Sequence, residues 1–180
     1  NSTKYWFKSW WQIKFTNSGN TLFYQIFSDQ SSSSKSPNFN KKVTHAQWEE
    51  LAYFPQSEQY MLGNYQEIGA TQFPFKKNVL EKMNLTLAYG IIRLDVKPRK
   101  YSKSSMRNGL GDRVSILFDN MGQVFLYEGY SGDKGDIYPY DKKRRNPLKE
   151  KLELKFSSLK DEACICIYPV TGYIENCQCE

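Results

Sequence analysis

One stretch decides the fold: residues 111–130, which read GDRVSILFDNMGQVFLYEGY. Its apolar residues fall at every second position on both sides of a turn rich in Asp, Asn and Gly at 119–122. Alternation of this kind predicts an antiparallel β-hairpin with strands at 113–118 and 124–129. Large side chains occupy both faces, so neither is expected to be an ordinary solvated face. We therefore expect a sheet that folds over and encloses something.

A second hairpin is predicted near the start of the chain, because 11–16 and 22–27 alternate in the same way around a polar turn. Further strands are expected at 61–68, 84–96 and 152–156. Gly90, inside the long strand 84–96, suggests a bulge or a sharp bend. The chain contains no internal repeat and no linker that would divide it. We predict one domain over residues 1–180.

One short helix is predicted from Thr44, which can cap its start in a capping-box arrangement, to the residues before Pro55, which stops it. His45, the only histidine, lies in its first turn beside Glu49. Such a pair can perform acid–base chemistry, but it is more often a solvated helix surface. The Ser- and Lys-rich segment 29–42 is expected to be a mobile loop.

The bulk composition limits the classes of partner. Aromatic residues make up 16% of the chain, which suits strands or the lining of a ligand cavity. A net charge of +6 allows attraction to nucleic acid or acidic partners, although a dispersed charge of this size often serves solubility alone. No run approaches the about 18 apolar residues of a membrane span, so none is expected. Because the chain begins at Asn1 rather than Met, two interpretations are open: a mature form after removal of a targeting segment, or a trimmed form. The first would suit a secreted or organelle-lumen protein.

All four cysteines lie near the C-terminus, in two Cys-x-Cys pairs at 164–166 and 177–179. If 171–172 is a two-residue turn, Cys166 faces Cys177 and Cys164 faces Cys179 on one side of a hairpin. Two cross-strand disulfides, Cys164–Cys179 and Cys166–Cys177, are then geometrically acceptable. A tetrathiolate zinc site and four buried free thiols are the alternatives. The disulfide interpretation suits an oxidising compartment.

The Gly-Asp-Arg at 111–113, the Phe-Asp and Gly turn at 118–122 and the Tyr-Glu at 127–128 resemble a strand pair of calycin-type β-barrels, especially a group from cyanobacteria and plastids. The N-terminal Trp cluster followed by a hairpin is also similar to lipocalins. The predicted strands and the one short helix indicate a mostly β, antiparallel fold, and the resemblance implies that it is a calycin-like meander β-barrel of about 8–10 strands. It also implies a cavity for a small hydrophobic or amphipathic ligand, such as a fatty acid, pigment or bilin.

Five residues are candidates for lining this cavity: Trp11, Tyr24, Arg93, Tyr127 and Tyr138. The aromatic rings would bury and stack against the ligand, and Arg93 would pair with a carboxylate. The same residues could simply fill a dry core, and Arg93 could lie at an edge or point outward. No bound cofactor is expected, and a metal only under the zinc alternative for the cysteines.

A different class of function is a surface interaction module. The basic loops 97–107 and 142–151, with tyrosines beside them, would then bind an anionic macromolecule such as an acidic protein, a polysaccharide or a nucleic acid. An enzyme is the third option and the less expected one, because no nucleophile elbow or phosphate-binding loop is present. A site built from Glu128 and Arg113 would be one form of it. Some calycins are lyases that hold a bilin, and an activity of this kind is a minor form of the enzyme hypothesis.

Overall fold

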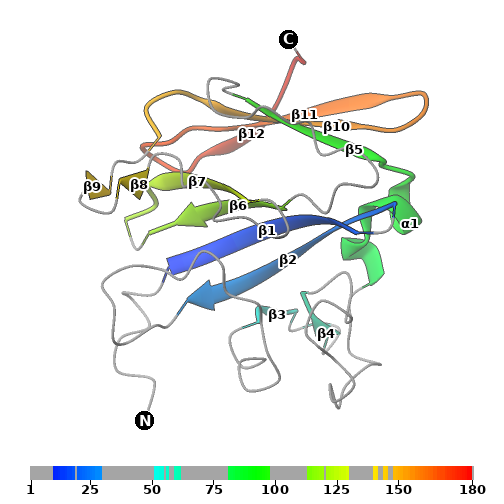
Figure 1. Cartoon of the computed structure of the whole chain (residues 1–180), viewed down its shortest axis with the longest axis horizontal. Helices are drawn as coiled ribbons and strands as arrows, with labels where there is room; N and C mark the ends of the chain where they lie inside the picture. The colour runs from blue at the N-terminus through cyan, green and yellow to red at the C-terminus, as the bar shows by residue number, and fades with distance from the viewer. Residues whose placement is uncertain are drawn as a thin grey trace.

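The computed structural model describes residues 10–18, 20–29, 51–54, 56, 59–61, 81–97, 113–119, 121–129, 140–141, 144–145 and 148–179. These residues are mostly β, with little helix, and their strands form two four-stranded antiparallel sheets (Figure 1). Two short pairs accompany them: β3 (Tyr53–Phe54) with β4 (Gln59–Tyr60), and β8 (Tyr140–Asp141) with β9 (Arg144–Arg145).

The first sheet has the strand order β2-β1-β6-β7. It consists of β1 (Trp10–Ser18), β2 (Thr21–Asp29), β6 (Arg113–Phe118) and β7 (Val124–Gly129). Both predicted hairpins are therefore confirmed. In the β6–β7 turn, the Asp119 carboxylate accepts 2.8 Å hydrogen bonds from the backbone N–H groups of Met121 and Gln123. This Asx-type turn fixes the register that places Phe118 opposite Val124.

The second sheet has the strand order β12-β11-β10-β5. It consists of β5 (Arg93–Lys97), β10 (Leu152–Ser157), β11 (Glu162–Ile167) and β12 (Ile174–Cys177). The strand predicted at 152–156 is confirmed. The strand order is not that of a simple meander, because β1 pairs with β6 as well as with β2, and β5 pairs with β10. No strand pair among the described residues joins the two sheets, so closure of a barrel stays a prediction.

The two sheets share one hydrophobic core. Each contributes every second residue of its strands, as period-two alternation requires. Its buried members are Phe15, Leu22, Leu85, Leu94, Val96, Val114, Ile116, Val124, Leu126, Leu148, Leu152, Leu154 and Ile167. The rings of Phe15 on β1 and Phe156 on β10 meet across this core, with centroids 5.9 Å apart. We call the face of each sheet that carries these residues its inner face.

The long strand predicted over 84–96 is partly wrong. Residues 81–89 form η5 (Glu81–Met83) and the short helix α1 (Leu85–Tyr89), and only β5 is extended. Asn84 caps α1 by accepting a hydrogen bond from the N–H of Leu87, 3.0 Å away. Gly90, with φ of 67°, ends the helix in the left-handed conformation instead of forming a bulge. The helix α1 is hydrogen-bonded to β2, because the N–H of Leu22 donates to the Thr86 hydroxyl oxygen at 2.8 Å.

The helix predicted from 44 is wrong at its C-terminal end, where β3 is extended. The backbone of Ala52 instead binds strand β2: its N–H donates to the carbonyl of Ile26 at 2.8 Å. The N–H of Ile26 donates in turn to the carbonyl of Met61 at 3.0 Å. These bonds satisfy the free edge of β2, which would otherwise expose unpaired backbone groups. Residues 44–50, and with them His45 and Glu49, lie outside the described residues, as do most of 29–42 and 61–68.

Candidate functional site

The inner face of the first sheet holds two of the predicted ligand-lining residues. Trp11, Ile13 and Phe15 share this face of β1, and Tyr24 on β2 lies directly opposite Phe15. Phe15 is buried, Ile13 and Tyr24 are half-buried, and Trp11 is 47% exposed. The structure therefore places Trp11 and Tyr24 on one apolar surface that is accessible in part.

Tyr24 packs its ring against Phe15, with centroids 5.7 Å apart. Burial raises the pKa of the Tyr24 phenol above its ordinary value, and the neighbouring Tyr89 raises this pKa further. The phenol is therefore neutral at physiological pH. A neutral hydroxyl at the border of an apolar surface can donate a hydrogen bond to a polar group of a ligand whose body lies on that surface.

The second sheet faces this surface with Phe156 of β10 and Ile165 of β11, which are only partly buried against the core. Sequence reasoning missed these two residues and Ile13. The signal was present, because each falls in the apolar series of a predicted strand. What the sequence could not show is which members of a series remain accessible, since that depends on how the two sheets face each other.

Arg93 is not brought to this surface. Leu94 and Val96 are the residues of β5 that point toward the core. Arg93 and Asp95 lie on the opposite, outer face of this strand. The guanidinium forms two contacts with the Asp95 carboxylate, at 2.7 Å from Nε and 2.9 Å from Nη2. Asp95 therefore holds one side of the guanidinium on the outer face of β5, away from the surface that carries Trp11 and Tyr24.

For the other predicted site residues, the structure describes at most the backbone. Tyr127 lies on β7 opposite Ser115, and the structure does not describe its side chain. Tyr138 lies outside the described residues. Arg113 and Glu128, the pair considered for an enzyme, are not cross-strand partners, because Arg113 is opposite Gly129 and Glu128 is opposite Val114.

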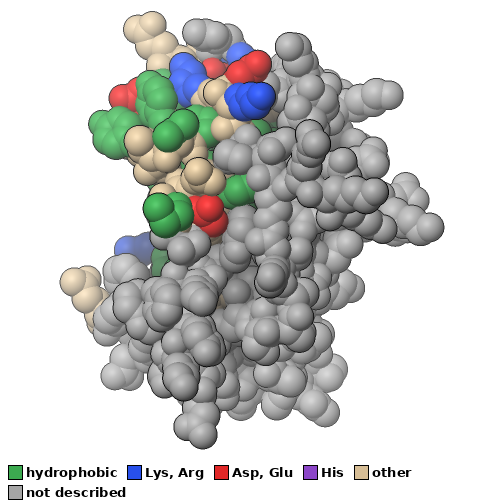
Figure 2. Space-filling view, turned by 90° about the vertical axis from the view of Figure 1, so that its left-hand side faces the viewer, with side chains coloured by type: hydrophobic (Ala, Val, Ile, Leu, Met, Phe, Trp, Pro, Cys, Tyr) green, Lys and Arg blue, Asp and Glu red, His purple; other side chains and the backbone are tan. Residues whose placement is uncertain are grey.

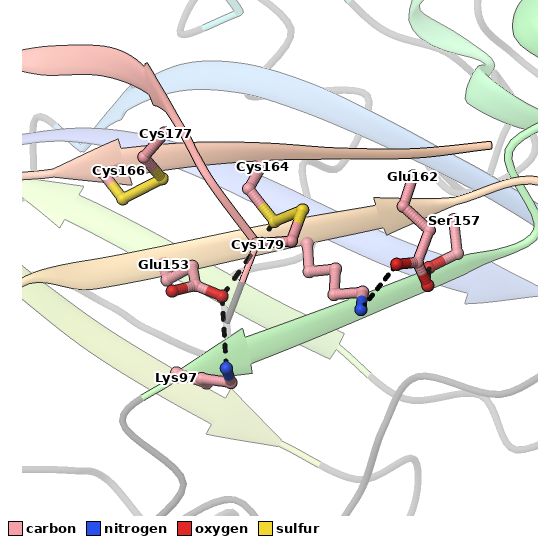
Figure 3. Close-up of a disulfide and its surroundings, with 9 residues drawn as sticks. Lys97, Glu153, Ser157, Glu162, Cys164, Cys166, Cys177 and Cys179 are labelled. Atoms are coloured by element: carbon pink, nitrogen blue, oxygen red, sulfur yellow. Dashed lines mark hydrogen bonds and ion pairs between the residues drawn. A yellow bond between two sulfur atoms is a disulfide. The ribbon is translucent and has the colours of Figure 1, made fainter.

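The C-terminal hairpin carries both predicted disulfides (Figure 3). Cys164 is bonded to Cys179 with Cα atoms 5.3 Å apart, and Cys166 to Cys177 with Cα atoms 5.8 Å apart. These four are all the cysteines of the chain, so no thiolate remains for the alternative zinc site. Two disulfides are typical of an oxidising, non-cytosolic compartment.

The register predicted for this hairpin is wrong by two residues. Cys164 lies opposite Cys177, and Cys166 lies opposite Glu175. The connection is longer than the assumed two-residue turn, because the N–H of Tyr168 donates to the carbonyl of Tyr173 at 2.9 Å, leaving four residues between them. A shift of two residues keeps every side chain on its face, so the sulfur atoms still gather on one side and both bonds form diagonally.

Alternating charges cover the outer face of the second sheet beside these disulfides (Figure 3). Lys97 Nζ lies 3.3 Å from the buried carboxylate of Glu153, and Lys155 Nζ lies 2.7 Å from the carboxylate of Glu162. Cys164 Sγ is 4.0 Å from Glu153 Oε1, a contact rather than a hydrogen bond because a disulfide sulfur carries no hydrogen. Lys97, the one described residue of the basic loop 97–107, is thus ion-paired within the sheet. Binding of an anionic macromolecule stays a prediction.

Exposed hydrophobic side chains gather where the β6–β7 and β11–β12 turns meet (Figure 2). They are Met121, Tyr168, Val170, Tyr173 and Ile174. The two turns are in contact, because the backbone of Gly122 approaches that of Thr171 and Gly172. The hydroxyl of Tyr168 donates a 2.6 Å hydrogen bond to the Glu175 carboxylate, which raises the pKa of this phenol.

Comparison of the chain with protein-family models, curated proteins and solved structures finds no match. Within the described residues, no group of three or more acidic, His or Cys side chains is arranged to hold a metal ion. No helix in the same part of the chain combines the length and the apolar character needed to cross a membrane.

Proposed function

We propose that this protein binds a small hydrophobic or amphipathic molecule, of the fatty-acid class, against the inner face of its first sheet. One observation carries the proposal: Ile13 lies mid-strand between Ile26 and Ile116 and points toward the second sheet, yet it is not fully buried. In a solidly packed two-layer core, a central inward-facing residue loses its contact with solvent. Partial access at this position supports a space between the sheets.

The chemistry of the surrounding side chains supports the same class of ligand. Trp11, Ile13 and Phe156 offer apolar area for an acyl chain or a planar ring, and burial of such area is the main driving force. The neutral Tyr24 hydroxyl supplies one hydrogen bond for the polar end of the ligand. Binding is therefore expected to depend little on salt, in contrast to binding through basic loops.

We also propose that the two sheets belong to a calycin-like barrel of a secreted or lumenal protein. Contacts at both edges support this arrangement. The N–H of Val124, at the start of β7, donates to the carbonyl of Pro169 after β11 at 3.0 Å, and the N–H of Leu22 on β2 binds Thr86 in the corner before β5. The two disulfides support export to an oxidising compartment.

The test is a titration of the intact protein with a dansyl-labelled undecanoic acid, followed by the rise in dansyl fluorescence. Ile13→Phe fills the accessible position and should weaken binding at least tenfold, and Tyr24→Phe should weaken it several-fold with little effect on packing. Tyr173→Phe, at an exposed tyrosine of the C-terminal hairpin, is the matched control and should bind as the unmodified protein does. Equal affinity of all four proteins would overturn the proposal, and a steep loss of binding in high salt would favour the basic loops.

A further inference from the structure

The C-terminal hairpin holds its four sulfur atoms in one zigzag row. Cys164 on β11 lies directly opposite Cys177 on β12, yet these two residues are not bonded to each other. Each is bonded diagonally instead, Cys164 to Cys179 and Cys177 to Cys166, on the same side of the hairpin (Figure 3). The row therefore runs in the order Cys179, Cys164, Cys177, Cys166, and we call it the sulfur row.

The two central residues of the sulfur row are within bonding reach of each other. The N–H of Tyr168 donates to the carbonyl of Tyr173, and the alternation of an antiparallel ladder then makes Cys164 and Cys177 a hydrogen-bonded pair as well. The Cα atoms of such a pair are about 5.5 Å apart, which a disulfide can span. The two existing bonds have Cα separations of 5.3 and 5.8 Å. A bond between Cys164 and Cys177 therefore needs little movement of the backbone.

Cys166 and Cys179, the two ends of the sulfur row, cannot pair with each other. Cys166 is opposite Glu175, and position 179 lies four residues farther along, which is about 13 Å in an extended chain. A disulfide requires Cα atoms within about 7 Å. A bond between the two central residues therefore leaves the two ends as free sulfurs.

The two ends also differ in their access to solvent. Cys179 is exposed, whereas Cys164 is 4% exposed and Cys166 is fully buried. A thiolate attacks the disulfide sulfur that it can reach, so a thiol from solvent should attack Cys179 and release Cys164. The Glu153 carboxylate is 4.0 Å from Cys164 Sγ and is opposite Cys166 in register. Cys164 and Cys166 thus share one charged neighbour, and neither is strongly favoured as the free sulfur.

We propose that the sulfur row is a thiol–disulfide exchange site, which takes up a small thiol at Cys179 and transfers the free sulfur to the buried end of the row. The incoming thiolate bonds to the sulfur of Cys179, and the Cys164–Cys179 bond breaks with its electron pair on Cys164. The Cys164 thiolate then bonds to Cys177, and the Cys166–Cys177 bond breaks with its electron pair on Cys166, which takes a proton. Two disulfides and one thiol are present before and after, so no oxidant or reductant is consumed.

The sulfur row lies on the outer face of the second sheet, because Cys164 and Cys166 are opposite Lys155 and Glu153 of that face. The surface proposed for the hydrophobic ligand is on the inner face of the first sheet. Each site can therefore exist without the other, and the outcome of either test leaves the other unchanged.

The test exposes the intact, oxidised protein to reduced glutathione, stops the exchange with acid and denaturant, and labels free thiols with N-ethylmaleimide before peptide mapping. We expect glutathione on Cys179 and maleimide divided between Cys164 and Cys166, with a Cys164–Cys177 disulfide in the molecules labelled at Cys166. Maleimide on Cys164 alone would show that the bond opens without transfer, and would overturn the proposal. Glutathione on Cys177, or a protein that takes up none, would also overturn it.

Two variants provide a matched test that needs no added thiol. Cys179→Ser and Cys164→Ser remove the same disulfide, so they share any loss of stability and differ only in which sulfur is left free. In Cys179→Ser the maleimide should divide between Cys164 and Cys166, because the free sulfur can exchange with the residue opposite it. In Cys164→Ser the maleimide should be confined to Cys179, since a central member of the row is missing. Maleimide on Cys164 alone in the first variant, or on Cys166 in the second, would contradict the exchange.

Discussion

Phe15 and Phe156 join the two sheets by a direct ring contact, with centroids 5.9 Å apart and ring planes inclined by 56°. Phe15 is buried and also contacts Tyr24, so it links the proposed hydrophobic surface to the core. We expect Phe15→Ala to reduce the free energy of unfolding by about 3–5 kcal/mol, because it leaves a cavity between the sheets. Phe156→Ala should cost less, since Phe156 is only partly buried.

A double-mutant cycle in urea measures whether the two rings interact beyond their burial. A coupling of about 0.5–1.5 kcal/mol between Phe15→Ala and Phe156→Ala is expected for a tilted aromatic pair. Phe15→Ala combined with a substitution at exposed Leu159 is the control and should be additive. Additivity of the Phe15 and Phe156 substitutions would contradict a direct interaction between the two rings.

The hairpins could be predicted from the sequence because strand pairing there is local. In 111–130 and 11–27 the alternation and the turn residues both predict two strands joined by a short turn, and the structure confirms both hairpins. The short helix α1, with its caps at 84 and 90, was harder to predict. Leu85, Leu87 and Tyr89 alternate like a strand, and five residues are too few to reveal a helical period. Asn84 and Gly90, which cap α1, were the signal that could have identified it.

The ion pairs on the outer face of the second sheet differ in burial, and this difference predicts unequal effects of two similar substitutions. The Glu153 side chain is 4% exposed and that of Glu162 is 52% exposed. Lys97→Met leaves a carboxylate buried without its cation and should cost on the order of 3 kcal/mol. Lys155→Met removes a surface pair and should cost less than about 1 kcal/mol. Urea unfolding of both variants checks the order, and equal costs would contradict it.

Two glycines with the same backbone conformation should respond differently to replacement by alanine. Gly90 and Gly172 have φ of 67° and 65°, and each alanine therefore costs about 1–2 kcal/mol in backbone strain. A Cβ at Gly90 meets nothing within 4 Å, whereas one at Gly172 would lie 2.9 Å from the Gly122 carbonyl oxygen. Gly172→Ala must also push the two turns apart, so thermal unfolding should show the larger loss for it. A larger loss for Gly90→Ala would contradict the close contact of these turns.

The disulfides should act as a unit, because they close nested loops with sequence separations of 15 and 11. With Cys164–Cys179 intact, loss of Cys166–Cys177 frees only a short segment. Cys166→Ala with Cys177→Ala should therefore cost less than the about 3 kcal/mol expected for an isolated loop of this size. Removal of both bonds should cost more than the sum of the separate removals. Urea unfolding of the three variants under non-reducing conditions measures this, and simple additivity would speak against shared restraint.

The sequence showed less of which side chains are buried than of the fold, and the outer face of the first sheet is the clearest case. Gln12, Lys14 and Thr16 alternate with apolar residues, a pattern that ordinarily indicates a solvated face. Only the neighbouring hairpin indicated otherwise, because its large side chains, with Leu117 and Phe125 on this face, predicted that neither of its faces is an ordinary solvated one. Burial of the face depends on contacts distant in sequence, which no local pattern encodes.

Tyr24 should make stability depend on alkaline pH. Its phenol pKa is raised by burial and then by Tyr89, so the folded protein holds this proton to a higher pH than the unfolded chain, in which tyrosine ionises near 10. The stabilisation is fully present below pH 10 and is lost as the pH rises through the folded pKa. Urea unfolding from pH 8 to 11 should therefore show a decline above pH 10 that is shallower in Tyr24→Phe. Tyr89→Phe should remove only the smaller part of the shift, because burial is its main cause. An unchanged slope in Tyr24→Phe would mean that the phenol is hydrated, and would contradict its partial burial beside Phe15.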